Sequence, residues 1–404
     1  MITMHQDHFV MRKIQEEDID QFSDLMKYVF QVSKDMIDDE GKMRKEKRHQ
    51  LKPGTALGWF EDDKLISQIV TLPFQVNIHG VTYEMGGVTG VGTYPEYAGH
   101  GLIHSLMKES LKNMREAGQY ISYLYPYSIP YYRKKGWEII SDRIEYQIKD
   151  SQLPKYEDVP GRMRRVDLDD EDAKNVYNEF AKKTNGALIR NQMAWDEWFR
   201  EESADLQLAV YYNDASVPEG YIFYRVLDEK FYIDEMIYLH EDARRGIWNF
   251  INAHLSMVYF VKGKTCVHEP VAFLLEDSEI KQIISPYYMG RIVDVMGFLK
   301  KFPFKPINNC KLILHITDPL LEWNRGTFTL EWDEMGQVFI THEADDADET
   351  GGIFLSIQTL TTMLLSYKRP AFLYEVNRIR GDISMVTILE QLIPDAEPCV
   401  FDYF

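Results

Sequence analysis

The stretch VTGVGTYPEYAGHGLIHSLM, residues 88–107, determines the fold expected for the first part of the chain. A strand pattern ends at about Thr93, the chain turns through PEYAGHG, and a helical pattern begins near Gly101. A helix N-terminus presents unpaired backbone N–H groups and the positive end of the helix dipole, and Gly99 and Gly101 let the backbone approach a ligand closely. The stretch predicts a cradle for a diphosphate; the alternative is a tight turn without a ligand.

The segments around this turn alternate between strand and helix patterns. Upstream we expect a strand at 9–14, a helix within 16–33, and four strands between residues 57 and 94, with turns at 61–63, His79-Gly80 and Gly86-Gly87. Downstream we expect a helix, a strand at 120–127, a short helix at 128–136 and a strand at 137–148. One face of the downstream helix carries Leu102, Leu106, Met107, Ser110, Leu111 and Met114. These elements predict an α+β unit over residues 1–150.

Two further units follow a proline-containing linker at 149–161. Residues 151–298 repeat the order of strands and helices more weakly, and EDARRGIW (241–248) aligns with EYAGHGLI (96–103). The second copy has one glycine where the first has two, and Arg245 and Trp248 would crowd a pyrophosphate. We therefore expect a degenerate copy that forms a wall of the substrate cleft. Residues 299–404 combine strands with apolar helices in a third α+β unit, whose apolar end PCVFDYF predicts a packed C-terminus.

The composition is that of an acidic globular protein. The chain has 404 residues, 45 Lys+Arg against 64 Asp+Glu, a formal net charge of −19 and 45% hydrophobic residues. This balance excludes wholesale disorder, disfavours nucleic acid and anionic membranes as partners, and favours cationic partners. No window approaches 18 apolar residues, and the N-terminus lacks the apolar core of a signal peptide, so we expect a cytoplasmic protein without a membrane partner.

The cysteines and histidines predict neither a disulfide framework nor a metal site. The chain has three cysteines, Cys266, Cys310 and Cys399. Their odd number, their wide spacing and the lack of a CxxC pair suit a reducing compartment. His100 and His104 have an i,i+4 spacing, but no Glu follows the first histidine, so the metalloprotease pattern fails.

A tyrosine motif follows the glycine turn and the next strand. Tyr132 begins a Y-x-x-x-G-[FW] pattern that ends in Gly136-Trp137. Together with the strand–turn–helix unit, it resembles the GNAT superfamily of acetyl-CoA-dependent N-acetyltransferases over residues 9–148. The turn departs from the superfamily pattern [QR]-x-x-G-x-[GA], because Ala98 stands at the Gln/Arg position and Ile103 at the last small one.

The order of the three units narrows the resemblance. Two tandem GNAT-like units, the second degenerate, a sterol-carrier-protein-like α+β domain and an apolar C-terminus resemble the enhanced-intracellular-survival (Eis) family. Members of that family acetylate several amines of aminoglycosides and other polyamine-like substrates. The resemblance implies direct transfer to a small cationic amine in a ternary complex, and a homo-oligomer built as a hexamer.

The resemblance also implies roles for named residues. Tyr132 is the expected general acid, and the α-carboxylate of the final residue, Phe404, is the expected general base. Acetyl-CoA is the expected cosubstrate, with no metal. Its expected contacts are Val91, Gly92 and Thr93 at the pantetheine, Gly99, His100, Gly101, Leu102, Ile103 and His104 at the pyrophosphate, and Tyr127 and Ser128 at the thioester.

Elementary acid–base chemistry is consistent with the two catalytic groups. A carboxylate with a reference pKa of about 3.5 stays ionised at pH 7 and accepts a proton from an amine, and a phenol with a pKa near 10 gives one to a departing thiolate. Two alternatives stay open: a GNAT enzyme that acts on a protein lysine or N-terminus, and a non-catalytic protein that binds an apolar ligand. Asp402 is expected to be a surface acid.

Overall fold

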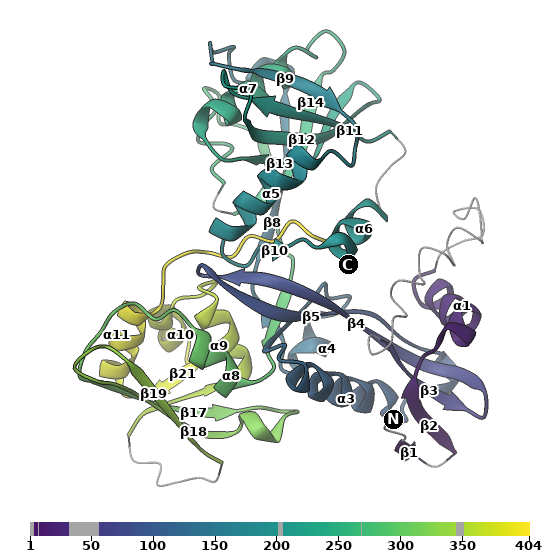
Figure 1. Ribbon diagram of the computed structural model, residues 1–404, viewed down its shortest axis with the longest axis vertical. Coiled ribbons are helices and arrows are strands. Elements are labelled where there is room, and N and C mark those ends of the chain that lie inside the picture. The colour runs from purple at the N-terminus through teal and green to yellow at the C-terminus, as the bar shows by residue number, and fades with distance from the viewer. Residues whose placement is uncertain (1–3, 7, 32–55, 201–204, 268, 345–350) are drawn as a thin grey trace.

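The computed structural model describes residues 4–6, 8–31, 56–200, 205–267, 269–344 and 351–404. They form three β-sheets, each packed against helices, and the C-terminal segment runs from the third lobe between the other two (Figure 1). Within these ranges, none of the helices combines the length and apolar character that a membrane span requires. The helices are α1 (Ile19–Val29), α3 (Leu102–Glu116), α4 (Ile129–Arg133), α5 (Glu171–Lys183), α6 (Gln192–Arg200), α7 (Glu241–Asn252), α8 (Val295–Lys301), α9 (Ile357–Leu364), α10 (Pro370–Glu375) and α11 (Ile383–Leu392).

The first sheet has the order β1-β2-β3-β4-β5-β6-β16-β7, with β10 paired to β4. Strands β1 to β5 are antiparallel to their neighbours, whereas β5 and β6 are parallel. The buried side chains of α1 and of α3 belong to two separate hydrophobic cores of this lobe. The strands are β1 (Met4–Gln6), β2 (Phe9–Lys13), β3 (Ala56–Glu61), β4 (Lys64–Ile78), β5 (Val81–Thr93), β6 (Ile121–Leu124), β7 (Glu138–Ile139), β10 (Leu188–Ile189) and β16 (Met289–Ile292).

Gly86-Gly87 does not form the turn that the sequence predicts, because β5 runs through it without interruption. A Cβ on Gly86 would lie 2.6 Å from Met114 Sδ of α3, and a Cβ on Gly87 would lie 2.7 Å from Phe404 Cε2. Successive residues of a strand face opposite sides of the sheet, so the two glycines admit a helix on one face and the chain end on the other. The strand β3 and the long strands β4 and β5 replace the four strands expected.

The first two sheets exchange strands. The single strand expected at 137–148 is divided into β7, in the first sheet, and β8, in the second, while β16 from the end of the second unit lies between β6 and β7. The sheets therefore cross the boundary predicted at residue 150. The second sheet has the order β15-β8-β14-β13-β12-β11-β9. Its strands are β8 (Asp142–Lys149), β9 (Arg162–Val166), β11 (Gln207–Tyr212), β12 (Pro218–Leu227), β13 (Lys230–Tyr238), β14 (Phe260–Cys266) and β15 (Lys281–Pro286).

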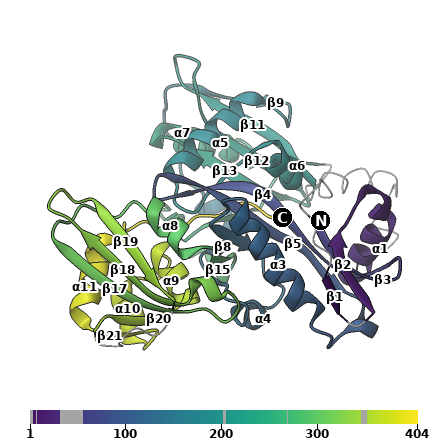
Figure 2. The ribbon, with the colours of Figure 1, turned by 60° about the horizontal axis from the view of Figure 1, so that its bottom comes forward.

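The third sheet has the order β19-β18-β17-β20-β21 and packs against the last helices. It lies beside the first sheet, as the two views show (Figures 1 and 2). One hydrophobic core, which includes Tyr83 of β5 and Phe328 of β18, is shared by these two lobes. The strands are β17 (Cys310–Thr317), β18 (Gly326–Trp332), β19 (Val338–Glu343), β20 (Ile353–Ser356) and β21 (Ile379–Gly381).

The C-terminal segment is buried, as its composition predicts. Cys399, Val400, Asp402 and Phe404 are each at most 5% exposed. Cys266 of β14 and Cys399 form a disulfide bond across 133 residues of sequence, so the expectation of unpaired cysteines is wrong for two of the three. The pairing depends on the return of the tail to the second sheet, which the spacing of cysteines in the sequence does not reveal.

Candidate active site

The first sheet opens where β5 and β6 separate. Their parallel ladder pairs Met85–Gly87 with Ile121–Tyr123 and then ends, while β5 continues to Thr93 alongside β4. Gly90 (φ +59°) lies at an irregularity of the β4 ladder, which bends the strand. Past Gly87, the edge of β5 that faces away from β4 has no strand beside it among the described residues. This edge includes Val91, Gly92 and Thr93, whose contact with the pantetheine stays a prediction.

Helix α3 begins in the predicted turn with an uncapped N-terminus. Gly99 (φ +88°) and Gly101 (φ +73°) are left-handed, and a Cβ on either would meet no atom within 4 Å. No side chain caps the helix, and its first turn holds no acidic residue. Trp59 Nε1 donates to the carbonyl oxygen of Leu102 (3.2 Å), which fixes the helix start against β3. Free N–H groups, a positive dipole end and open space fit the pyrophosphate predicted for residues 99–104.

The two histidines of this turn make separate contacts. The His100 ring lies edge-on to Phe9, with 5.7 Å between ring centroids, and His104 Nδ1 accepts from Lys135 Nζ at 2.8 Å. Among the described residues, no group of three or more His, Cys, Asp or Glu is arranged to hold a metal ion.

Helix α4 carries the predicted general acid. Ser128 is its N-cap residue, and Tyr127 just before it is 72% exposed. Tyr132 is buried, with its ring against Tyr127, Tyr131 and Trp137, and it belongs to the core on the α3 face of the sheet. Burial, more than the neighbouring phenols, raises the pKa of Tyr132, so the phenol keeps its proton at neutral pH.

Phe404 lies on the opposite face of the same strands. Its ring packs over Gly87 and lies 5.0 Å from the ring of Phe74 and 5.4 Å from that of Tyr288. Because Gly87 is the last β5 residue paired with β6, the chain end lies beside the point where the strands separate. The rings of Tyr132 and Phe404 thus belong to opposite faces of one opened sheet.

Buried polar groups around the opening lack hydrogen-bond partners within the described part of the chain. The hydroxyl of Tyr123, which pairs with Gly87, and both amide atoms of Gln68, which pairs with Gly92, are orphaned in this way. Each such group costs about 1–3 kcal/mol. Orphaned polar groups at an opening in a sheet are typical of a site that a polar ligand completes.

A buried charge cluster holds the segment that ends in Phe404. Asp402 accepts from Arg190 Nε (2.6 Å) and from Tyr177 Oη (3.1 Å), and Arg190 donates two further bonds to Glu235 (3.0 and 2.6 Å). The side chains of Arg190, Glu235 and Asp402 are at most 3% exposed. Asp402 is therefore not the surface acid expected from the sequence. Arg190 and Glu235 carry no sequence signal, because the partners lie 45 and 212 residues from Arg190.

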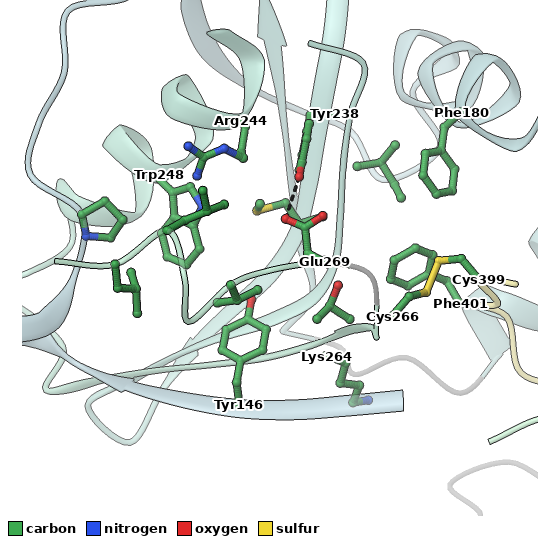
Figure 3. A pocket seen from close by; sticks show the side chains of 17 residues that line it. Tyr146, Phe180, Tyr238, Arg244, Trp248, Lys264, Cys266, Glu269, Cys399 and Phe401 are labelled. Atoms are coloured by element: carbon green, nitrogen blue, oxygen red, sulfur yellow. Dashed lines mark hydrogen bonds between the residues drawn. A yellow bond between two sulfur atoms is a disulfide. The ribbon is translucent and has the colours of Figure 1, made fainter. Parts of the chain in front are cut away.

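The second lobe contains a counterpart of this opening. The parallel ladder of β13 and β14 ends at Ile233, although β13 continues to Tyr238. Beyond that point lies a cavity of about 110 Å³, lined by Tyr238, Glu269 and Trp248 (Figure 3). Tyr238 donates a hydrogen bond to Glu269 at 2.6 Å, so a contact between two side chains of the protein occupies this space.

Helix α7, the counterpart of α3, begins with charges that disfavour an anion. Glu241 and Asp242 occupy its first turn, where α3 has no acid. Trp248 lines the residual cavity, as the sequence predicts, whereas Arg245 turns to ion pairs with Asp242 and Glu157. The second unit therefore differs from the first in its acidic helix start and in the contact between Tyr238 and Glu269, and its degeneracy stays a prediction.

Comparisons with known proteins agree with this architecture. Models for an acetyltransferase (GNAT) domain match residues 10–140 and 186–292, and a model for a sterol carrier protein domain matches residues 295–400. A search of curated proteins gives no match.

Solved structures match over the whole chain. A conserved protein from Enterococcus faecalis V583, described as a probable N-acyltransferase, is 31% identical at a TM-score of 0.89, with 98% of this chain and 100% of that chain covered. A GCN5-related N-acetyltransferase from Anabaena variabilis (22% identity, TM-score 0.85) and Eis1 from Mycobacterium abscessus (16%, 0.80) share the fold, each with 98% of this chain and 100% of the other covered. Because a relative at 31% identity is matched over its full length, the chain belongs to the GNAT superfamily of N-acetyltransferases and resembles Eis in its domain order.

Proposed function

We propose that the enzyme transfers the acetyl group of acetyl-CoA directly to an amine of a small polycationic acceptor, such as an aminoglycoside or a polyamine, in a ternary complex. The observation that carries the proposal is the opening between β5 and β6, around which the uncapped N-terminus of α3, Tyr132 and Phe404 are arranged. Residues 99–104 would hold the pyrophosphate, Val91, Gly92 and Thr93 the pantetheine arm, and Tyr127 with Ser128 the thioester end.

Each catalytic group has one task in this proposal. Acetyl-CoA supplies an acetyl thioester. The carboxylate of Phe404 accepts a proton from the acceptor ammonium and so frees the nitrogen lone pair that attacks the thioester carbonyl. Backbone N–H groups on the open edge of β5 stabilise the negative charge that develops on the carbonyl oxygen. Once the C–N bond has formed, Tyr132 gives its proton to the sulfur as the C–S bond breaks, and the second proton that the nitrogen releases restores the phenol through solvent.

A cavity of about 390 Å³ beside the tail is the place we propose for the acceptor. Tyr287 and Tyr403 line it, and Tyr287 also donates to the carbonyl oxygen of Asp402 at 2.7 Å. The preference for a polycation rests on the net charge of −19, which attracts cations at long range, and on the terminal carboxylate. The charged residues that line the cavity have both signs: Glu197, Asp234, Arg143, Arg225 and Lys264.

The mixed charge of the cavity favours one second candidate. A peptide N-terminus or protein lysine brings an amine together with carboxylates, and both signs would find a partner among the lining residues. Parallel assays with aminoglycosides, polyamines and peptides, each at several concentrations, therefore separate the two candidates.

Turnover on this panel tests the proposed function directly. The enzyme with acetyl-CoA and an aminoglycoside or polyamine is expected to release free thiol at a rate that depends on both substrates, with acetylated amine as the second product. Mass spectrometry of the acceptor identifies the acetylated product. Release of thiol on peptides alone would overturn the polycation proposal, and no release on any amine would overturn the acetyltransferase assignment of this site.

Replacing the proposed acid gives a second test. Tyr132→Phe is expected to lower kcat about 10²-fold, because no other group would protonate the departing thiolate, while acetyl-CoA binding measured by calorimetry changes little. Tyr131→Phe is the matched control, since its ring belongs to the same aromatic group. Equal losses in the two variants would contradict the specific role of Tyr132.

Assembly and location complete the proposal. We propose a homohexamer, on the resemblance to the Eis family, and light scattering of the purified protein measures it. The cytoplasmic location stays a prediction, and the disulfide between Cys266 and Cys399 argues against a strongly reducing compartment.

A further inference from the structure

A lysine and a histidine meet at the first turn of α3. His104 is the third residue of the helix, and Lys135, which follows α4, donates from Nζ to His104 Nδ1 at 2.8 Å. Lys135 also lies over the ring of Tyr131, at 5.8 Å from its centroid. Lys108 stands one turn further along α3. Within the described ranges, Lys135 has no carboxylate at ion-pair distance.

This pair presents only hydrogen-bond donors to its surroundings. A lysine ammonium donates and never accepts, so His104 Nδ1 carries no proton and the ring's N–H is at Nε2. The remaining N–H groups of Lys135, the Nε2–H of His104 and the first backbone N–H groups of α3 are therefore all donors. The charges acting on His104 come from Lys135 and Lys108, and with the larger effect of burial they lower its pKa. An anion would satisfy the donors and relieve the repulsion.

The main chain of Lys135 is fixed before any ligand arrives. Buried Arg291 donates from Nη1 to the carbonyl oxygen of Lys135 and is held on its other side by Asp318, at 2.6 and 2.8 Å. A Cβ on Gly136 would lie 1.5 Å from Arg291 Nη1, so only glycine leaves room for this contact. The Y-x-x-x-G motif thus places Tyr132, in α4, and Lys135, just after α4, on one rigid segment that leads to β7.

We propose that Lys135 and His104 bind the pyrophosphate of acetyl-CoA. They would supply the side-chain contact that the turn itself lacks, since Ala98 stands at its Gln/Arg position. The pyrophosphate is favoured over the other phosphate of the cofactor, because His104 lies in the helix turn whose backbone N–H groups point to the same anion. The inference rests on the proposed function, in that it takes acetyl-CoA as the ligand of this turn.

Calorimetric titration of Lys135→Gln with acetyl-CoA tests the inference. We expect the Kd to rise about tenfold or more, the usual size for a lost hydrogen bond to a charged group. Lys134→Gln is the matched control, because it removes the same charge from the exposed neighbouring residue, and its Kd should change less than about twofold. Thermal unfolding of both variants checks the fold, and His104→Gln is titrated in the same way if Lys135→Gln does not fold.

Dephospho-CoA, which keeps the pyrophosphate and lacks the 3′-phosphate, identifies the contact. Lys135→Gln should weaken dephospho-CoA by the same factor as CoA. A weakening confined to CoA would move Lys135 to the 3′-phosphate and overturn the inference, as would equal Kd values for the variant and the unaltered enzyme. Failure of the unaltered enzyme to bind acetyl-CoA would instead overturn the proposed function, so the two failures are distinguishable.

Discussion

A single glycine appended after Phe404 is expected to lower the kcat of acetyl transfer about 10²–10⁴-fold, the range typical of a lost general base. The α-carboxylate would move about 3.8 Å further along the chain, and a neutral amide would take its place at residue 404, whose ring lies beside Gly87. An amide neither accepts a proton from an ammonium nor attracts one. Acetyl-CoA affinity should change little, because the α3 turn lies on the other side of the strands. Release of free thiol measures kcat, and calorimetry measures the affinity.

The interpretation of the extended enzyme depends on two controls. Phe404→Leu keeps the carboxylate and removes the ring contacts with Phe74 and Tyr288, so its loss of kcat should be much smaller. The anchors of the tail at Cys399 and Asp402 lie upstream and are unaltered in both proteins, so the thermal midpoint should fall only in Phe404→Leu, which loses the buried ring contacts. Undiminished kcat in the extended enzyme would remove the carboxylate from the mechanism.

Elements with local signals were predictable from the sequence. The six residues assigned to one face of the helix after Gly101 are all buried in α3, because a 3.6-residue period fixes which side chains meet the sheet. The same holds for the glycine turn, since Gly99 and Gly101 adopt the left-handed conformations that favour glycine. The glycine turn and the short helix with Tyr132 could thus be placed without any tertiary contact.

Features that depend on distant partners could not be predicted. Gly86-Gly87 has the composition of a turn, and only Met114 on one side and Phe404 on the other explain why a straight strand needs two glycines there. Asp402 has the sequence context of an exposed acid, yet Arg190 lies beside it after a return of 212 residues. Strand exchange between the first two sheets has the same origin, because β8 and β16 are each locally ordinary strands.

One half of the candidate site has local sequence signals, and the other half depends on distant partners. Its cofactor half, from β5 through the α3 turn to α4, is contiguous in sequence and carries motifs. Its acceptor half is assembled from the chain end, Tyr287 and the second sheet, and no motif spans these parts. The contact between Lys135 and His104 combines both cases. Each residue belongs to a motif, but the sequence does not show that they meet, because their contact depends on the relative placement of α3 and α4.

Arg190→Ala is expected to lower the free energy of unfolding by about 3–5 kcal/mol, the cost of leaving buried charges without their partner. Asp402 and Glu235 would face each other in the interior with no cation between them. The tail would then detach beyond Cys399, which the disulfide still holds, so kcat should also fall because the carboxylate of Phe404 is no longer fixed. Trp195 lies 4.5 Å from the Arg190 guanidinium, so its fluorescence reports the change during urea denaturation.

Arg245→Ala separates the buried network from ion pairing in general. Arg245 is 32% exposed and pairs with acids on the surface of the same lobe, so its loss should cost at most about 1 kcal/mol and leave kcat unchanged. The triple variant Arg190→Met, Glu235→Gln, Asp402→Asn removes all three charges together and should regain much of the stability. It should regain kcat only if the neutral side chains still hold the tail. A stable but inactive triple variant would therefore show that the charges position residue 404. Full activity of Arg190→Ala would show that the tail needs no such anchor.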